Sequence, residues 1–174
     1  PGSGKSTTLR RLAADLAAKA QQDQHAPLPL LVSMGEWRGD EPLSSFLAAA
    51  APEIGWAVDA LSRAGRLILL LDGLNEVPTA TRAAKAQQVR HLSHHAALVV
   101  SCRREDYTGE LDLALDTLTL EPLSPQRIRA AVQHWVASSG EEQEIAERFF
   151  WQLAGGERLA AVLQDWCAAG GDED

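Results

Sequence analysis

PGSGKSTT, residues 1–8, is the stretch that decides the fold, because seven of its eight letters fit inside a phosphate-binding loop. The full pattern reads G-x-x-x-x-G-K-[ST]. Gly4, Lys5 and Ser6 supply its end, while its first glycine would fall two positions before Pro1. Glycines let backbone N–H groups curl around an anion, Lys5 would reach the β- and γ-phosphates, and the Ser6 hydroxyl would ligate Mg²⁺. A flexible loop that contains Gly-Lys-Ser by chance is the alternative.

The segment after this loop has the pattern of a helix. Leu9, Leu12 and Leu16 recur at helical spacing, and alanine, the best helix former, fills much of the rest. A helix over residues 5–22 would point its positive N-terminal end at the phosphates. The loop and helix together predict a nucleotide site whose contacts are Gly2, Ser3, Gly4, Lys5, Ser6 and Thr7.

Composition and charge exclude several function classes. The 174 residues are 45% hydrophobic, which is enough for one domain with a sizeable core. A net charge of −8 gives no support for nucleic acid as a partner, and no apolar run approaches the length of a membrane span. Cys102 and Cys167 lie far apart and match no metal spacing. We expect reduced thiols in a cytoplasmic protein.

Strand and helix signals alternate up to about residue 122 and are followed by helices alone. Apolar runs predict buried parallel strands at 27–34, 66–72 and 96–102, and an alternating pattern predicts a last strand at 116–123. Between these strands we expect a helix that ends near Pro52 and further helices at 55–64 and 80–95. After the last strand, helices are expected at 124–138, 141–153 and 156–168.

This order of elements predicts an α/β fold, the parallel sheet of a P-loop NTPase with its first strand missing. That core would cover residues 1–122. A small helical subdomain would follow over 123–169, and an acidic tail over 170–174. In such sheets, ligands bind at the carboxyl ends of the strands, so the loops after the second and third apolar runs would lie near the phosphates.

An acidic cluster follows the run at 66–72. A carboxylate at the end of a buried strand is costly unless it serves a purpose. Asp72 is placed to hold Mg²⁺, directly or through water, and Glu76 to orient or deprotonate the attacking water. Asn75, between them, can hydrogen-bond but cannot act as a base. The alternative is a strand followed by an ordinary Asp-Gly turn.

Two arginines follow the next strand. Arg103 or Arg104 would sense the γ-phosphate and stabilise charge in the transition state, as an arginine does in other nucleotide hydrolases. Of the two, Arg103 is the preferred candidate. The alternative for either is an ordinary surface salt bridge with Glu105 or Asp106.

Four motifs together resemble the NACHT domain of the STAND class of signal-transduction NTPases, with bacterial members the most similar. They are GSGKST (2–7), LLLDGLNEVP (69–78), VVSCRREDY (99–107) and LEPLSPQRI (120–128). The resemblance implies ATP or GTP bound with Mg²⁺, and a switch from a closed monomer to an open homo-oligomer on nucleotide exchange or hydrolysis. It also implies partners in the parent chain, an effector domain and a C-terminal sensor built of repeats.

By motif match, Lys5 and Ser6 become phosphate and metal contacts, Asp72 the metal carboxylate, Glu76 the hydrolytic acidic residue and Arg103 the sensor arginine. Many members carry aspartate where Asn75 stands, so slow hydrolysis is expected. In this class a proline-containing turn lies near the adenine. Residues 153–159 contain no proline.

The strand that leads into the phosphate loop lies, in this class, between the sensor strand and the last strand. Without it two strands lose a ladder partner and the loop loses its anchor. The 174 residues are therefore expected to be a fragment that binds nucleotide poorly by itself. Three other functions remain open: a scaffold that binds nucleotide without hydrolysing it, an AAA-type ATPase, and a small-molecule kinase, for which no acceptor site is evident.

Overall fold

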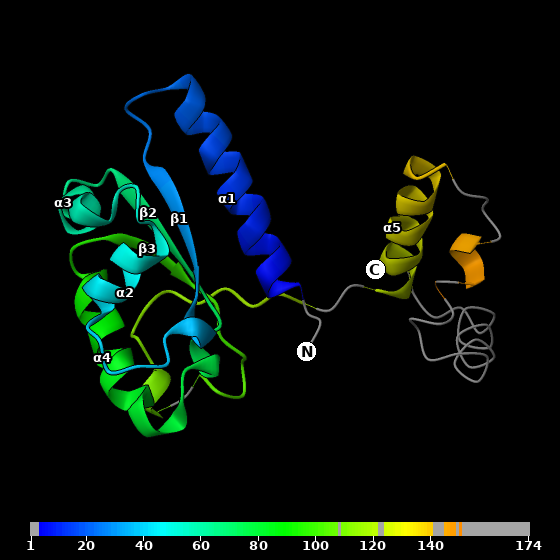
Figure 1. The fold of residues 1–174 in the computed structure, drawn as a ribbon. Helices are drawn as coiled ribbons and strands as arrows, with labels where there is room; N and C mark the ends of the chain where they lie inside the picture. Colours follow the sequence, from blue (N-terminus) through cyan, green and yellow to red (C-terminus); the bar gives the residue numbers. More distant parts are fainter. Residues whose placement is uncertain (1–3, 108, 122–123, 141–144, 149, 151–174) are drawn as a thin grey trace. The chain divides into compact units, whose positions relative to one another are not determined.

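The computed structural model describes residues 4–107, 109–121, 124–140, 145–148 and 150 (Figure 1). The chain divides into two compact units, Pro1–Leu120 and Glu121–Asp174, and each is described by itself. Within the described residues, no helix has both the length and the apolar character needed to cross a membrane.

The first unit is built on a parallel sheet in the order β1-β2-β3. Its strands are β1 (Leu28–Ser33), β2 (Leu67–Asp72) and β3 (Ala97–Val100). The pairs Ser33↔Asp72 and Leu71↔Val100 bring the carboxyl ends of the strands to one edge. Leucines on both faces of β2 are fully buried, which is why an uninterrupted apolar run forms the central strand. The predicted α/β sheet is confirmed.

Helices cover both faces of the sheet (Figure 1). One face packs against α1 (Lys5–Gln22), which contacts β1 and β2, and the other lies under α2 (Leu43–Ala50), α3 (Val58–Arg63) and α4 (Arg82–Ser93). Short 3-10 turns occupy Met34–Glu36, Gly55–Ala57, Leu74–Glu76, Thr79–Thr81 and Gly109–Leu111. Because α1 runs antiparallel to the strands, its first turn lies at their carboxyl ends.

The main core lies between the sheet and α2–α4. Alternate strand residues point into it, and they meet the aromatic pair Trp37 and Phe46, whose rings stack at 5.5 Å. The strand residues of this core are Leu30, Val32, Leu67, Leu69, Leu71, Leu98 and Val100. The period of two therefore turns Asp72 toward the face that α1 covers.

The predicted strand at 116–123 is wrong over its described part, because residues 116–121 form no strand. Among the described residues, the sheet consists of β1, β2 and β3, and this segment pairs with none of them. Its N–H and C=O groups therefore have no ladder in which to pair. Leu118 is 94% exposed, and Val99, on β3, is 41% exposed, so both apolar side chains meet solvent.

Several helix bounds differ slightly from the predicted ones. The helix expected over 55–64 begins as a 3-10 turn, where Gly55 lies so close to α2 that a Cβ would come within 2.6 Å of the Ala48 carbonyl oxygen. The helix expected over 80–95 also begins with a 3-10 turn, and α4 ends at Ser93.

The second unit contains α5 (Pro125–Ser138). Its N-cap, Ser124, accepts a hydrogen bond from the Arg127 N–H at 3.3 Å, and residues 145–148 of the next expected helix are helical. A small apolar cluster joins Val132, Val136, Ala146 and Phe150. The helix expected at 156–168 and the proline-free segment 153–159 lie outside the described residues.

Candidate nucleotide-binding site

The start of α1 has the form of an anion-binding helix end. Gly4 is its N-cap and adopts the left-handed conformation, with φ 81°, while its carbonyl accepts from the Thr8 N–H at 2.8 Å. Glycine has no side chain to cap the first turn, and no acidic residue lies there. The first N–H groups of a helix have no acceptor within it, and the helix dipole adds positive potential. This end is therefore suited to a phosphate.

Of the predicted phosphate contacts, Lys5, Ser6 and Thr7 form the first turn of α1. Gly2 and Ser3 lie outside the described residues. Four of the six predicted positions are described: Gly4 is the N-cap, and the other three form one helical turn. They lie at the end of α1 nearest to the carboxyl edge of the sheet (Figure 1).

Asp72 is the last residue of β2 and is partly exposed. Its Oδ1 accepts a hydrogen bond from the Ser101 hydroxyl at 2.5 Å, and the same hydroxyl accepts from the Gly73 N–H at 2.9 Å. Within the described part of the chain, no hydrogen bond is formed by the second carboxylate oxygen. Asp72 thus has one oxygen held by the neighbouring strand and one that is available to a cation.

Glu76 ends the 3-10 turn that follows Asp72. Gly73 starts this turn with φ 82°, and its carbonyl accepts from the Glu76 N–H at 2.8 Å. The exposed Glu76 side chain folds back over the turn. A Cβ added at Gly73 would lie 2.9 Å from Glu76 Cδ, and one added at Gly35 would lie 3.1 Å from Glu76 Oε2. The carboxylate is therefore beside the loops that follow β1 and β2.

Arg103 follows β3 and has an exposed side chain. Its backbone N–H donates to Asn75 Oδ1 at 3.0 Å, and the carbonyl of the largely buried Asn75 accepts from the Arg82 guanidinium at 2.9 Å. Among the described residues, no ion pair joins Arg103 to Glu105 or to an acidic residue elsewhere. The surface salt bridge that was the alternative for this arginine is thus not formed.

The charge of Lys5 acts on the end of β3. Burial is the main cause that raises the pKa of the Cys102 thiol above its ordinary value, and the negative charge of Asp106 raises it further. The positive charge of Lys5 and backbone hydrogen bonds from Asn75 and Arg103 oppose this rise. The thiol is therefore neutral at pH 7. The Lys5 ammonium is therefore close enough to act electrostatically on Cys102, which lies between Ser101 and Arg103.

The donor set at this edge fits a magnesium–nucleotide. Mg²⁺ prefers oxygen ligands and is held by one or two protein groups together with substrate phosphates. The Ser6 hydroxyl and the Asp72 carboxylate are oxygen ligands of this kind, and the start of α1 fits an anion. In the described part of the chain, no group of three or more His, Cys, Asp or Glu side chains forms a metal cage. The Ser6 hydroxyl and the Asp72 carboxylate suit a metal that is shared with phosphates.

Comparison with known families agrees with this arrangement. A family model of the NACHT domain matches residues 1–139. The chain belongs to the NACHT family. No curated protein and no solved structure matches the chain. The NACHT domain is a nucleotide-binding NTPase of signalling proteins, and the match confirms the family that the four sequence motifs indicated.

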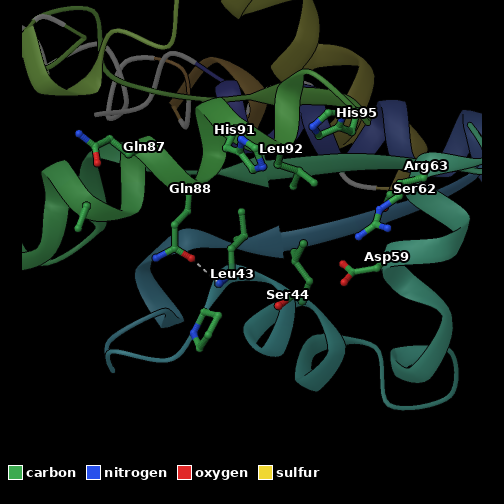
Figure 2. A pocket seen from close by; sticks show the side chains of 13 residues that line it. Leu43, Ser44, Asp59, Ser62, Arg63, Gln87, Gln88, His91, Leu92 and His95 are labelled. Carbon is green, nitrogen blue, oxygen red and sulfur yellow. Dashed lines mark hydrogen bonds between the residues drawn. The ribbon is translucent and has the colours of Figure 1, made fainter.

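A hollow of about 440 Å³ in this NACHT domain lies away from the candidate site (Figure 2). It is lined from α2, α3 and α4, on the face of the sheet opposite α1, by side chains that include Leu43, Arg63 and His91. The Gln88 amide oxygen accepts from the Leu43 N–H at 2.8 Å and joins α4 to the start of α2 (Figure 2). None of the predicted site residues contributes to this hollow.

Sequence reasoning does not find Ser101. It predicts that Asn75 can hydrogen-bond, but it does not identify the Arg103 N–H as its partner. Both bonds cross from one strand end to the next and depend on how β2 and β3 pair. A serine directly after an apolar strand whose neighbour ends in aspartate is the signal that points to Ser101.

Proposed function

We propose that this NACHT domain is a signalling switch that binds ATP, or GTP, with Mg²⁺ and hydrolyses it slowly. The observation that carries the proposal is the carboxyl edge of the sheet. The start of α1 has no side-chain cap, and one carboxylate oxygen of Asp72 is hydrogen-bonded to Ser101. Glu76 and Arg103 follow the neighbouring strands β2 and β3. This combination of an anion site, a cation ligand and a second carboxylate suits a magnesium–triphosphate.

The phosphates would be held by the backbone of Gly2, Ser3 and Gly4 and by the first turn of α1. Lys5 would neutralise charge on the β- and γ-phosphates, and Thr7 would add a contact from its N–H group. Ser6 and Asp72 would supply the protein ligands of Mg²⁺, which neutralises charge that develops on the phosphate oxygens.

Glu76 would orient or deprotonate the attacking water, because its exposed carboxylate lies beside the loops that follow β1 and β2. Arg103 would stabilise charge on the γ-phosphate, since its side chain is exposed and has no ion pair to an acidic group among the described residues. Asn75 holds the Arg103 backbone and contributes no base, so slow turnover is expected.

Switching would follow from the nucleotide state. Contacts from the γ-phosphate reach both the end of β2 and the end of β3 in this scheme, so hydrolysis or exchange would change how these loops are held. The change would pass to effector and sensor domains in the parent chain and favour a homo-oligomer on activation.

The experiment that tests this function uses the full-length protein. Glu76→Gln should lower Mg²⁺-dependent ATP turnover by about 100-fold or more, because loss of a positioned base costs about 10²- to 10⁴-fold. Lys5→Ala should weaken nucleotide binding by about 10- to 100-fold, since hydrogen bonds to charged groups contribute about 1.5–3 kcal/mol. Glu53→Gln and Lys19→Ala change the same residue types at exposed positions of the first unit and should leave both measurements unaltered.

Each outcome has a distinct meaning. Tight nucleotide binding without turnover in the wild-type protein would favour the scaffold that holds nucleotide and assembles partners. Turnover that survives Glu76→Gln would contradict the role of Glu76. No Mg²⁺-dependent nucleotide binding at all would overturn the proposed function.

A further inference from the structure

We propose that Ser101 is a positioning residue for the magnesium ligand: its hydroxyl holds one oxygen of Asp72 so that the other faces the cation. The inference rests on the proposed function, because it assigns a role toward the same Mg²⁺. Ser101 lies in the motif VVSCRREDY, two positions before Arg103, and its contacts with Asp72 and Gly73 point to this role.

The Ser101 hydroxyl makes two bonds of opposite sense. It donates to Asp72 Oδ1 at 2.5 Å and accepts from the Gly73 N–H at 2.9 Å. The residue is 8% exposed, so neither bond competes with bulk water. A hydroxyl has one hydrogen and two lone pairs, and this geometry uses the hydrogen on the carboxylate and a lone pair on the amide. An ionised carboxylate strengthens the first bond.

The backbone of Ser101 is fixed by the same neighbour. Its N–H donates to the Leu71 carbonyl at 2.8 Å, and its carbonyl accepts from the Leu74 N–H at 2.8 Å. Ser101 therefore clamps the chain immediately before and after Asp72. The hydroxyl is thus presented from a fixed backbone, and rotation of the Asp72 carboxylate would break a bond that the strand pairing holds in place.

A third side-chain bond joins the same two loops. Asn75 Oδ1 accepts from the Arg103 N–H at 3.0 Å. The loop after the proposed metal ligand and the loop of the proposed sensor arginine are therefore joined by three side-chain hydrogen bonds at the ends of β2 and β3. A carboxylate that is oriented in advance loses less freedom when it binds a cation, and partners of metal ligands typically change metal affinity or activity about 10- to 100-fold.

The test is a Mg²⁺ titration of the full-length protein at equilibrium, with a fluorescent ATP analogue as the probe. For Ser101→Ala, we expect the Mg²⁺ concentration at half-saturation to rise about 10-fold or more. Affinity for the same analogue in EDTA should stay within about 2-fold, because the phosphate contacts of α1 do not involve Ser101. Ser101→Thr keeps the hydroxyl and should recover the wild-type Mg²⁺ dependence.

Ser93→Ala is the matched control. The Ser93 hydroxyl also makes a short bond, to the Arg90 carbonyl at 2.7 Å, but it does so at the end of α4 that leads into the start of β3, at the opposite edge of the sheet. It should leave the Mg²⁺ dependence unchanged. Should Ser101→Ala fail to fold, Ser101→Cys retains the size with a weaker donor and should show the same direction of change.

The outcomes separate this inference from the function on which it rests. Wild-type binding that depends on Mg²⁺, combined with an unchanged titration in Ser101→Ala, overturns the role of Ser101 alone. Equal losses with Mg²⁺ and in EDTA would mean that Ser101 only supports the fold, and they overturn the inference too. A wild-type protein whose nucleotide binding is absent or indifferent to Mg²⁺ overturns the proposed function and, with it, this inference.

Discussion

Two buried polar side chains of the first unit differ in whether their polar groups find a partner. Lys85 is 2% exposed, yet its ammonium donates to the Trp37 carbonyl and lies 4.7 Å from the centre of the Trp37 ring. Both contacts offset the loss of water around the charge. Ser62, on α3, is also buried, but its hydroxyl has no hydrogen-bond partner among the described residues. Lys85 is thus satisfied and Ser62 is not.

The unpartnered hydroxyl leads to a prediction at Ser62. Ser62→Ala should raise the free energy of unfolding by about 1 kcal/mol, because an unsatisfied buried polar group costs about 1–3 kcal/mol and alanine favours the helix. Urea denaturation measures the change. Ser138→Ala, which removes a hydroxyl bonded to the Trp135 carbonyl at 2.8 Å at an exposed position of α5, should not stabilise the protein. A loss of stability in Ser62→Ala would contradict the prediction.

At this scale the sequence identifies charged residues better than their partners. Asp72, Glu76 and Arg103 stand out because carboxylates and arginines at strand ends are costly or rare without a purpose. The partners, Ser101 and Asn75, are ordinary residues whose bonds depend on the pairing of β2 with β3. Strand pairing is a property of the tertiary structure, so a local pattern does not contain it.

At the scale of elements, apolar runs predict the strands, and pairing decides whether they form. The runs at 27–34, 66–72 and 96–102 lie against helices and become β1, β2 and β3. The segment 116–121 has the right alternation, yet it pairs with no strand of the described sheet and forms none itself. Sequence alternation is therefore a necessary signal, and a partner has to be supplied by the rest of the sheet.

The turn after β2 gives a prediction with a built-in comparison. Gly73 and Gly65 both have positive φ, 82° and 67°, but only at Gly73 would a Cβ meet another side chain, Glu76. Gly65→Ala should lower the free energy of unfolding by about 1 kcal/mol, the cost of the left-handed conformation alone. Gly73→Ala should cost about 2 kcal/mol or more, because the contact with Glu76 adds to that strain.

Urea denaturation of the two variants compares these costs directly. Equal losses in Gly65→Ala and Gly73→Ala would mean that Glu76 moves aside without cost, which would contradict its packing over the turn. The Gly73→Ala variant should also show lower ATP turnover in the full-length protein, since Glu76 is displaced, whereas Gly65→Ala should turn over ATP as the wild type does.

At the scale of the whole molecule, the NACHT match extends over both units, since it ends at residue 139, beyond the start of α5. Each unit nevertheless has its own apolar cluster. The large cluster lies between the sheet and α2–α4, and the small one joins α5 to residues 146 and 150. The sequence pattern predicts the change from alternating strands and helices to helices alone. It does not predict which apolar residues pack together in one cluster.

Separate clusters predict separate local stabilities. Leu69, at the centre of β2, is fully buried in the large cluster, and Val136 is buried in the small one. Leu69→Ala should destabilise the first unit by about 3–5 kcal/mol, and Val136→Ala should destabilise the second by a smaller amount, because each substitution leaves a cavity in one cluster only. Hydrogen exchange resolved by peptide should show faster exchange in β1–β3 for the first variant and in α5 for the second. Faster exchange of β1–β3 in Val136→Ala, to the same extent as in Leu69→Ala, would mean that the two clusters unfold as one cooperative unit.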